Sequence, residues 1–222
     1  MSFAPEAGNP IDRWSDRAQA YRESDAHREG QDLDQLVAWA SGARTALDVA
    51  TGGGHVARRL REEGLEVVTC DPAPGMHPDV ICRAESLPFA DGAFDVVACR
   101  TAAHHFEDVV ESTREMARVS RDRLLIVDTV FMNADVEAAE RLRDPSHVRN
   151  YTEAEWRGFL EDAGLSVAEV KLLPHAIDFA AWLARTGCVG DEAARVEAFL
   201  GPRVSGGRLT LDKIAIRAVT GR

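Results

Sequence analysis

The sequence has few cysteines, and their spacing builds neither a metal site nor a disulfide framework. The four are scattered, with no CxxC pair among them: Cys70, Cys82, Cys99 and Cys188. Zinc knuckles and disulfide scaffolds both depend on closely spaced cysteines. The seven histidines also form no HxH, HxxxH or HExxH pattern. We therefore expect no metal site.

The sequence also lacks long apolar runs and an excess of positive charge. No apolar run approaches the roughly 20 residues of a membrane-spanning helix. The first residues show no basic start followed by an apolar stretch, so we expect a cytoplasmic protein. The formal net charge is −11. Nucleic acids and anionic membranes attract basic surfaces, so we expect neither as a partner.

The first half of the chain alternates apolar strands with amphipathic helices. Strands are predicted over 44–50, 65–70, 94–99 and 123–129, and helices over 55–64 and 107–120. Such alternation is typical of an α/β fold with a mostly parallel sheet. A length of 222 residues with 45% hydrophobic residues suits one domain with a cap.

The rhythm changes after about residue 130. Helices are predicted over 133–143, 152–164, 178–186 and 191–201, and strands over 166–173 and 208–220. Thr152 and Glu155 form a capping-box pattern at the start of the second helix. The last strand alternates polar and apolar residues, which favours an antiparallel strand near an edge of the sheet. The polar segment 10–40, upstream of the first strand, is expected to be helical.

A glycine-rich stretch, "LDVATGGGHVARRL" (47–60), joins the first strand to the first helix. Glycines allow a tight turn and a close approach of a ligand, and the helix that follows presents free N–H groups. Asp71 ends the second strand and is placed to accept hydrogen bonds from ribose hydroxyls. Together they predict a nucleotide site, although a turn without a ligand remains the alternative.

The nucleotide is open to two interpretations. Gly52, Gly54 and Ala57 satisfy a loose GxGxxG/A pattern, which would suit an NAD(P)-dependent oxidoreductase. Asp48 lies within the first strand, where a carboxylate disfavours an anionic pyrophosphate. The Asp48 carboxylate would be compatible with a ligand that carries an ammonium group. S-adenosylmethionine has such a group and no phosphate.

Two stretches carry a family resemblance: "LDVATGGGHVARRL" with "VVTCDP", and "AESLPFADGAFDVVACRTAAHHFED". The sequence resembles the Rossmann-like S-adenosylmethionine-dependent methyltransferases, in the branch around the ubiquinone and menaquinone biosynthesis C-methyltransferases. The resemblance implies a parallel sheet with an antiparallel last strand and helices on both faces. It also implies methyl transfer from S-adenosylmethionine to a small molecule, leaving S-adenosylhomocysteine. Residues 1–222 would form one domain, with a helical lid (1–43), a cofactor-binding half (44–130) and a substrate cap with the final strands (131–222).

The resemblance also implies the residues of a cofactor site. Asp48, Ala50, Gly52 and Gly54 would line the methionine end, with Thr51 and His55 beside it. Asp71 would bind the ribose, and Pro72, Ala84 and Glu85 would approach the adenine. The backbone of Arg100 would contact the methionine portion, and Tyr21 and His27 of the lid would face the cofactor.

The sequence departs from the family pattern on the adenine side. Arg83 stands where members commonly carry an acid, and it cannot accept a hydrogen bond. The segment 72–82 has three prolines and a glycine where the family usually fits a helix, so we expect no full helix there. These departures leave a non-catalytic protein with the same fold as an alternative.

Catalytic groups are expected after the fourth strand, because ligands bind beyond the carboxyl ends of parallel strands. "AAHHF" (102–106) lies there, so His104 and His105 are candidate general bases, His105 slightly favoured. A helix-capping role is the alternative for both, and for Asp128, which ends the fifth strand. His147, Arg149 and Tyr151 fall where the family builds its substrate cap and are candidate substrate contacts.

Overall fold

A computed structural model of the protein describes residues 10–24 and 28–221. Its strands are β1 (Thr45–Val49), β2 (Glu66–Asp71), β3 (Val80–Ile81), β4 (Phe94–Arg100), β5 (Ser120–Thr129), β6 (Leu165–Asp178), β7 (Val204–Ser205) and β8 (Arg208–Thr220). Its α-helices are α1 (Pro10–Asp16), α2 (Ala18–Arg22), α4 (Gln31–Trp39), α5 (His55–Glu62), α6 (Val109–Val119), α7 (Ala134–Arg143), α8 (Glu153–Asp162), α9 (Phe179–Ala184) and α10 (Gly190–Leu200). Single 3-10 turns cover Pro74–Met76, Ala103–His105 and Gly201–Arg203.

All eight strands join one sheet, in the order β3-β2-β1-β4-β5-β8-β6, with β7 paired to β8. The pairs from β3 through to β5 are parallel, whereas β8 runs antiparallel to β5, β6 and β7. The predicted α/β fold with a mostly parallel sheet and an antiparallel last strand is confirmed. The chain leaves β1 toward β2 on one side and reaches β4 on the other, which creates a crevice at their carboxyl ends.

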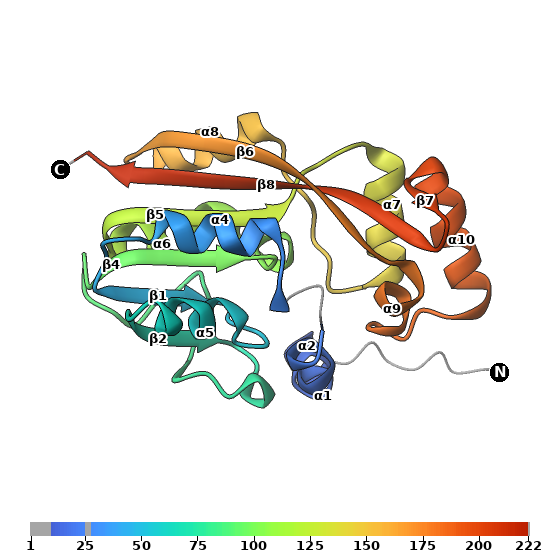
Figure 1. Ribbon diagram of the computed structural model, residues 1–222, viewed down its shortest axis with the longest axis horizontal. Coiled ribbons are helices and arrows are strands. Elements are labelled where there is room, and N and C mark those ends of the chain that lie inside the picture. Colours follow the sequence, from blue (N-terminus) through green and yellow to red (C-terminus); the bar gives the residue numbers. More distant parts are fainter. Residues whose placement is uncertain (1–9, 25–27, 222) are drawn as a thin grey trace.

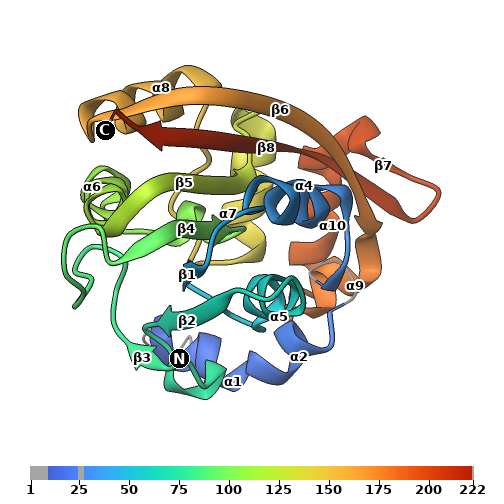
Figure 2. The ribbon, with the colours of Figure 1, turned by 60° about the vertical axis from the view of Figure 1, so that its left-hand side comes forward.

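Helices cover both faces of the sheet (Figures 1 and 2). The helices α4 and α5 pack on one face, where Leu36 and Leu60 are fully buried against Val96. The helices α6 and α8 pack on the other, where Met116 and Trp156 are fully buried. Burial of these side chains stabilises the fold by about 1.5–3 kcal/mol each. The crevice therefore rests on a rigid, doubly covered sheet.

The segment after β5 builds a cap beyond the carboxyl ends of the parallel strands (Figure 1). The helices α7, α9 and α10 share a separate apolar cluster with the ends of β6 and β8, in which Ala139, Trp182, Val196 and Leu209 are buried. Strand β6 reaches Asp178, five residues beyond the predicted end at 173. Pairing with β8 continues over that extension, from Pro174 to Asp178. The extension carries the sheet into the cap.

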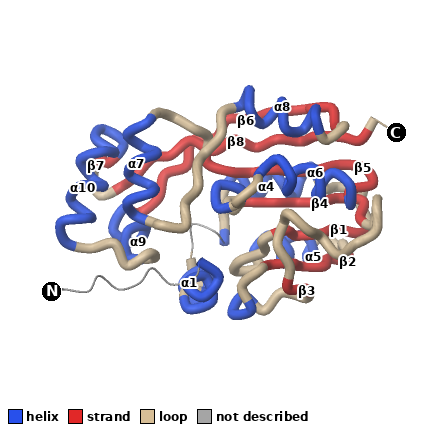
Figure 3. Tube along the Cα trace, turned by 180° about the vertical axis from the view of Figure 1, so that it is seen from behind, coloured by secondary structure: helices blue, strands red, loops and turns tan. Residues whose placement is uncertain are grey.

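The N-terminal helices lie between the cap and the β3 edge of the sheet (Figures 1 and 3). Ala18 packs against Ala73 and Met76, which follow β2. The segment after Asp71 forms a 3-10 turn and the short strand β3, so the absence of a full helix over 72–82 is confirmed. The predicted capping box is also present, because Thr152 and Glu155 hydrogen-bond each other's backbone N–H groups at the start of α8.

Candidate active site

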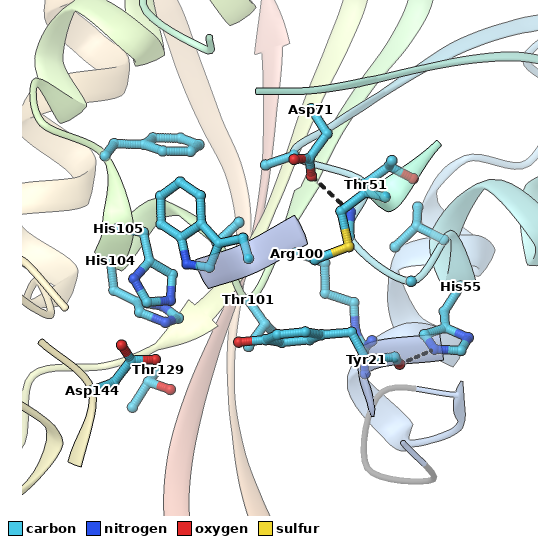
Figure 4. A pocket seen from close by; sticks show the side chains of 18 of the residues that line it. Tyr21, Thr51, His55, Asp71, Arg100, Thr101, His104, His105, Thr129 and Asp144 are labelled. Carbon is cyan, nitrogen blue, oxygen red and sulfur yellow. Dashed lines mark hydrogen bonds between the residues drawn. The ribbon is translucent and has the colours of Figure 1, made fainter. Parts of the chain in front are cut away.

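A pocket opens at the carboxyl ends of β1 and β4 and continues to the cap. Figure 4 shows Asp71 and Thr51 on one side, His104, His105 and Asp144 on the other, and the Tyr21 ring between them. Thirteen of the residues predicted for the site line it: Tyr21, Asp48, Ala50, Thr51, Gly52, His55, Asp71, Pro72, Ala84, Glu85, Arg100, His104 and His105. These residues come from segments far apart in the sequence, which the strand order brings to one edge.

The backbone is strained where β1 and β4 end at the pocket. Ala50 follows β1 with a φ of 54°, and Thr101 follows β4 with a φ of 56°. Residues other than glycine rarely adopt this left-handed backbone conformation, and those that do occur most often at functional sites. Gly52 has a φ of 51°, and a Cβ added there would meet no atom closer than the Ala50 oxygen at 4.0 Å. The turn therefore leaves open space beside exposed backbone.

Two carboxylates hold this turn in shape. Asp48 is buried and accepts hydrogen bonds from Thr51 Oγ1 at 2.6 Å and from Ala57 N at 3.1 Å. Burial raises the pKa of Asp48 to about 6, against these two hydrogen bonds, so the group is mostly charged at neutral pH. Asp71 accepts from Gly52 N at 3.0 Å through one oxygen and from Ala73 N at 2.9 Å through the other (Figure 4). Each Asp71 oxygen keeps lone pairs for ligand hydroxyls.

Arg83 is engaged by neighbouring acids on the adenine side. It lies 3.4 Å from Glu85 and 2.9 Å from Glu107. Glu85 in turn accepts hydrogen bonds from the N–H groups of Glu107 and Asp108, at 3.1 and 3.4 Å. The basic side chain that departs from the family pattern is thus paired with acids of its own loop and of the segment before α6.

The N-terminal helices close over the glycine turn. The His55 ring donates from Nε2 to the Tyr21 carbonyl at 3.0 Å (Figure 4). Burial lowers the pKa of His55 and raises the pKa of Tyr21, so both are neutral at pH 7. A Cβ on Gly53 would meet Tyr21 O at 2.8 Å, which is closer than real Cβ contacts. The lid helix therefore lies directly on the glycine turn.

A buried ion cluster lies at the β4 side of the pocket. Asp32 accepts from Arg100 Nε at 2.8 Å and from Lys213 Nζ at 2.7 Å. Burial lowers the pKa of Lys213 to about 8, although Asp32 opposes this, while the two cations hold the pKa of Asp32 well below its usual range. The Arg100 side chain is therefore committed to α4, which agrees with a cofactor contact through its backbone.

The two adjacent histidines have different environments. His104 Nδ1 lies 2.6 Å from Asp128 Oδ1, and its backbone N–H donates to the other oxygen at 3.0 Å. Burial would lower the pKa of His104, but Asp128 outweighs it and raises this pKa. The His105 ring donates from Nδ1 to the Ser146 carbonyl at 3.0 Å. Burial, followed by His104, lowers the pKa of His105 to about 3.

Several predicted residues do not line the pocket. His147 is buried against Glu137, with Nε2 2.9 Å from Oε1, and Arg149 pairs with Glu155 at 2.6 Å. Tyr151 packs edge-to-face on Trp156 and Phe159. Gly54 begins α5 with a φ of 77° and is not in the lining either. His27 lies outside the described residues.

The lining also contains residues that sequence reasoning missed, most of them in the cap: Glu140, Arg143, Asp144, His175, Ile177, Trp182, Arg185, Leu211 and Lys213. One signal was available. Leu209, Leu211 and Lys213 share one face of β8 by the strand period, and all three are buried. A buried lysine beside Leu209, Leu211 and Ala215 on this face indicates a polar site.

Three buried side chains on and after α7 could hold a metal ion. The ligand atoms of Glu137, Glu140 and His147 all lie within 4.8 Å of one another. Asn150 also joins the cluster, donating from Nδ2 to both glutamates. The carboxylates of Glu137 and Glu140 already accept hydrogen bonds from His147 and Asn150.

The fold and the site define a class. A Rossmann-like sheet with a glycine turn after β1, a carboxylate ending β2 and a buried carboxylate within β1 is the arrangement that the resemblance predicts for S-adenosylmethionine-dependent methyltransferases. The residues fit that cofactor, because Asp71 keeps free acceptors, Asp48 provides a negative charge and Gly52 leaves space.

Comparisons with known proteins agree with this class. A family profile described as a methyltransferase domain matches residues 47–126. An uncharacterized methyltransferase of Bacillus subtilis (strain 168), YcgJ, is 30% identical over 207 residues, covering 82% of each chain. The chain also resembles a demethylmenaquinone methyltransferase of Beutenbergia cavernae, 36% identical over 94 residues and 37% of this chain against 39% of that protein.

Solved structures show the same likeness. The crystal structure of YcgJ superposes with a TM-score of 0.74 at 27% identity, covering 86% of this chain and 98% of that one. The structure of a proposed methyltransferase from Bacillus halodurans C-125 gives a TM-score of 0.76 at 28% identity, covering 87% and 100%. The chain belongs to the methyltransferase family. It is an S-adenosylmethionine-dependent enzyme of the Rossmann-like class, which replaces the oxidoreductase alternative.

Proposed function

We propose that this methyltransferase transfers the methyl group of S-adenosylmethionine to a small-molecule acceptor held between His104 and the cap. The observation that carries the proposal is the continuity of one pocket, from Asp71 at the end of β2 to Trp182 on α9. The acceptor end is enclosed by the lid helices α1 and α2 and by cap helices, so it suits a small molecule better than a folded macromolecule. No helix among the described residues is long and apolar enough to cross a membrane.

The cofactor half would work by positioning. Asp71 would accept hydrogen bonds from the ribose, while Asp48 would favour the ammonium group of the methionine end. Ala84 and Glu85 would lie beside the adenine, and Tyr21 would close the site from the lid. When bound, S-adenosylmethionine supplies a methyl group on a positively charged sulfur. The protein's task is then to place the acceptor in line and to exclude water.

His104 is our candidate for the general base. The carboxylate of Asp128 accepts a hydrogen bond from Nδ1–H, which leaves Nε2 as the nitrogen with a free lone pair. Asp128 also stabilises the imidazolium that forms when His104 takes a proton from the acceptor. A histidine that is oriented and supported by a carboxylate fits general-base catalysis.

His105 fits a different role. Its depressed pKa makes it a poor proton acceptor at neutral pH, so it would stay uncharged. With Nδ1 bound to the Ser146 carbonyl, Nε2 can accept a hydrogen bond from the acceptor. We therefore assign proton removal to His104 and orientation to His105.

An acceptor screen tests the proposal. The protein is incubated with S-adenosylmethionine and a library of small phenols, amines, thiols and carboxylic acids, and S-adenosylhomocysteine release is measured. We expect release that depends on one acceptor class and that falls in the His104→Ala variant. Methylation of a protein or nucleic acid, without turnover of any small molecule, would contradict it.

A further inference from the structure

Five basic side chains line the pocket, and most of them have acidic partners: Arg83, Arg100, Arg143, Arg185 and Lys213. Arg83 is paired with Glu85 of its own loop and with Glu107, which precedes α6. Arg100 and Lys213 share Asp32. Each of these three cations therefore has a carboxylate in contact, although one carboxylate serves both Arg100 and Lys213.

Arg143 and Arg185 differ from the other three. Among the described residues, no carboxylate oxygen lies within 4.0 Å of a side-chain nitrogen of Arg143 or Arg185. The Arg143 guanidinium lies 4.0 Å over the Trp182 ring, and its Nε donates to the Trp182 carbonyl at 3.0 Å. Burial lowers the pKa of Arg143 to about 10 and also lowers that of Arg185. Both cations are therefore partly desolvated without a carboxylate in contact.

The acids nearest to these arginines are already engaged. Asp144 accepts two hydrogen bonds from Ser146, at 3.0 Å from N and 2.7 Å from Oγ, and lies 3.9 Å from Arg17. Burial raises the pKa of Glu140 to about 7, so this group is only partly charged at neutral pH. With Arg17 included, positive charge exceeds negative charge at the cap end of the pocket, in a chain whose net charge is −11.

The two arginines converge from different elements. Arg143 ends α7, and Arg185 follows α9, so the fold of the cap sets their separation. Both interact electrostatically with Tyr21, which lines the same pocket and is drawn in Figure 4. A group bound by the arginines would therefore lie in the same pocket as Tyr21 and His104.

We infer that the acceptor is an anion, with a carboxylate or phosphate group bound by Arg143 and Arg185 and its nucleophilic atom directed to His104. This inference rests on the proposed function, since it names the substrate class of that site. Guanidinium groups bind both oxyanions through paired hydrogen bonds, and a partly buried site strengthens them. The anchor would orient a small acceptor for in-line attack.

The test uses the complex of the protein with S-adenosylhomocysteine, titrated by calorimetry with benzoate, phenyl phosphate and the neutral benzamide. We expect at least one anion to bind at least tenfold more tightly than benzamide. Arg143→Gln and Arg185→Gln should each weaken that anion at least tenfold and leave S-adenosylhomocysteine affinity within about twofold. The anion that binds distinguishes a carboxylate site from a phosphate site.

Arg195→Gln provides the matched control, because Arg195 is an exposed arginine of α10 outside the pocket lining. It should leave anion binding unchanged, and circular dichroism should show all variants folded. Equal anion affinity in the Arg143→Gln, Arg185→Gln double variant, or no binding of either anion, would overturn the inference. Failure of the parent protein to bind S-adenosylhomocysteine would instead count against the proposed function.

Discussion

His104 and Asp128 show how one hydrogen bond sets the chemistry of a residue. The sequence places two histidines after the fourth strand and favours His105 only slightly as the base, because adjacent residues have the same local context. The fold separates them by giving His104 a carboxylate from β5 and His105 a backbone carbonyl. Burial lowers the pKa of both histidines, but Asp128 outweighs it at His104, whereas burial and the neighbouring His104 prevail at His105.

The pH dependence of turnover should follow from the His104–Asp128 pair. A general base works unprotonated, and Asp128 raises the pKa of His104 above its ordinary value of 6.5. The rate constant kcat/KM should therefore rise with pH through a pKa above 6.5. Asp128→Asn removes the charge that raises this pKa, so the rise should move to lower pH and kcat should fall about 100-fold.

The measurement is a pH–rate profile of S-adenosylhomocysteine release for the parent and Asp128→Asn. Asp135→Asn, an exposed change on α7, serves as the control and should reproduce the parent profile. An unshifted profile in Asp128→Asn would show that His104 is not the titrating base.

The Asp32 cluster predicts a large effect on stability. Asp32→Asn leaves Arg100 and Lys213 buried without their counter-charge, which should lower the free energy of unfolding by about 3–5 kcal/mol. Asp34→Asn is the matched control on the same helix. Its carboxylate pairs with Arg59 but is 62% exposed, so the cost should stay below about 1 kcal/mol.

Urea unfolding monitored by circular dichroism measures both variants. The sign of the pH dependence follows from the depressed pKa of Asp32. The contribution of the Asp32 carboxylate to the free energy of unfolding is fully present above the unfolded-state pKa near 3.8. This contribution is lost progressively as the pH falls below 3.8. Similar losses in Asp32→Asn and Asp34→Asn would show that the cluster contributes no more than a surface pair.

At the scale of elements, the lid and the glycine turn form one unit. Gly53 lies so close to α2 that an added Cβ would meet Tyr21 O and His55 Nε2, both at 2.8 Å. Gly53→Ala should displace the lid and weaken S-adenosylmethionine binding about tenfold. Gly158→Ala on α8 is the control, because a Cβ there meets no atom within 4 Å.

Equilibrium titration with S-adenosylmethionine measures the effect of Gly53→Ala, and limited proteolysis after α2 reports the displaced lid. We expect cleavage near the lid to accelerate in Gly53→Ala and not in Gly158→Ala. Unchanged affinity and cleavage in Gly53→Ala would mean that the lid does not control the cofactor site.

Local sequence patterns predicted most helices and strands. The features that they did not predict depend on contacts between residues far apart in the sequence. The glycine turn, the β2 carboxylate and the capping box of α8 depend on neighbours in sequence, and the structure has all three. The extension of β6 to Asp178 depends on pairing with residues of β8 that lie 30 or more positions away along the chain. Arg143 and Arg185 were missed because only the packing of the cap brings α7 and α9 together.

At the scale of the whole molecule, strand order makes the site. The strands β1 and β4 are neighbours because the sheet is extended from β1 first through β2 and β3 on one side and then through β4 and β5 on the other. The long strands β6 and β8 hold the cap beyond the carboxyl ends of these strands (Figures 1 and 2). The acidic surface and the arginine-lined cap end then have opposite charge. This contrast favours anionic acceptors inside the pocket over polyanions on the surface.

The central claim is that Asp71 and the glycine turn bind S-adenosylmethionine. The most direct measurement is calorimetric titration of the parent and Asp71→Ala with S-adenosylmethionine and S-adenosylhomocysteine. We predict micromolar binding of both by the parent and a loss of about 1.5–3 kcal/mol in Asp71→Ala, since hydrogen bonds to a charged group are removed. No binding by folded parent protein, or equal affinity in Asp71→Ala, would contradict the account.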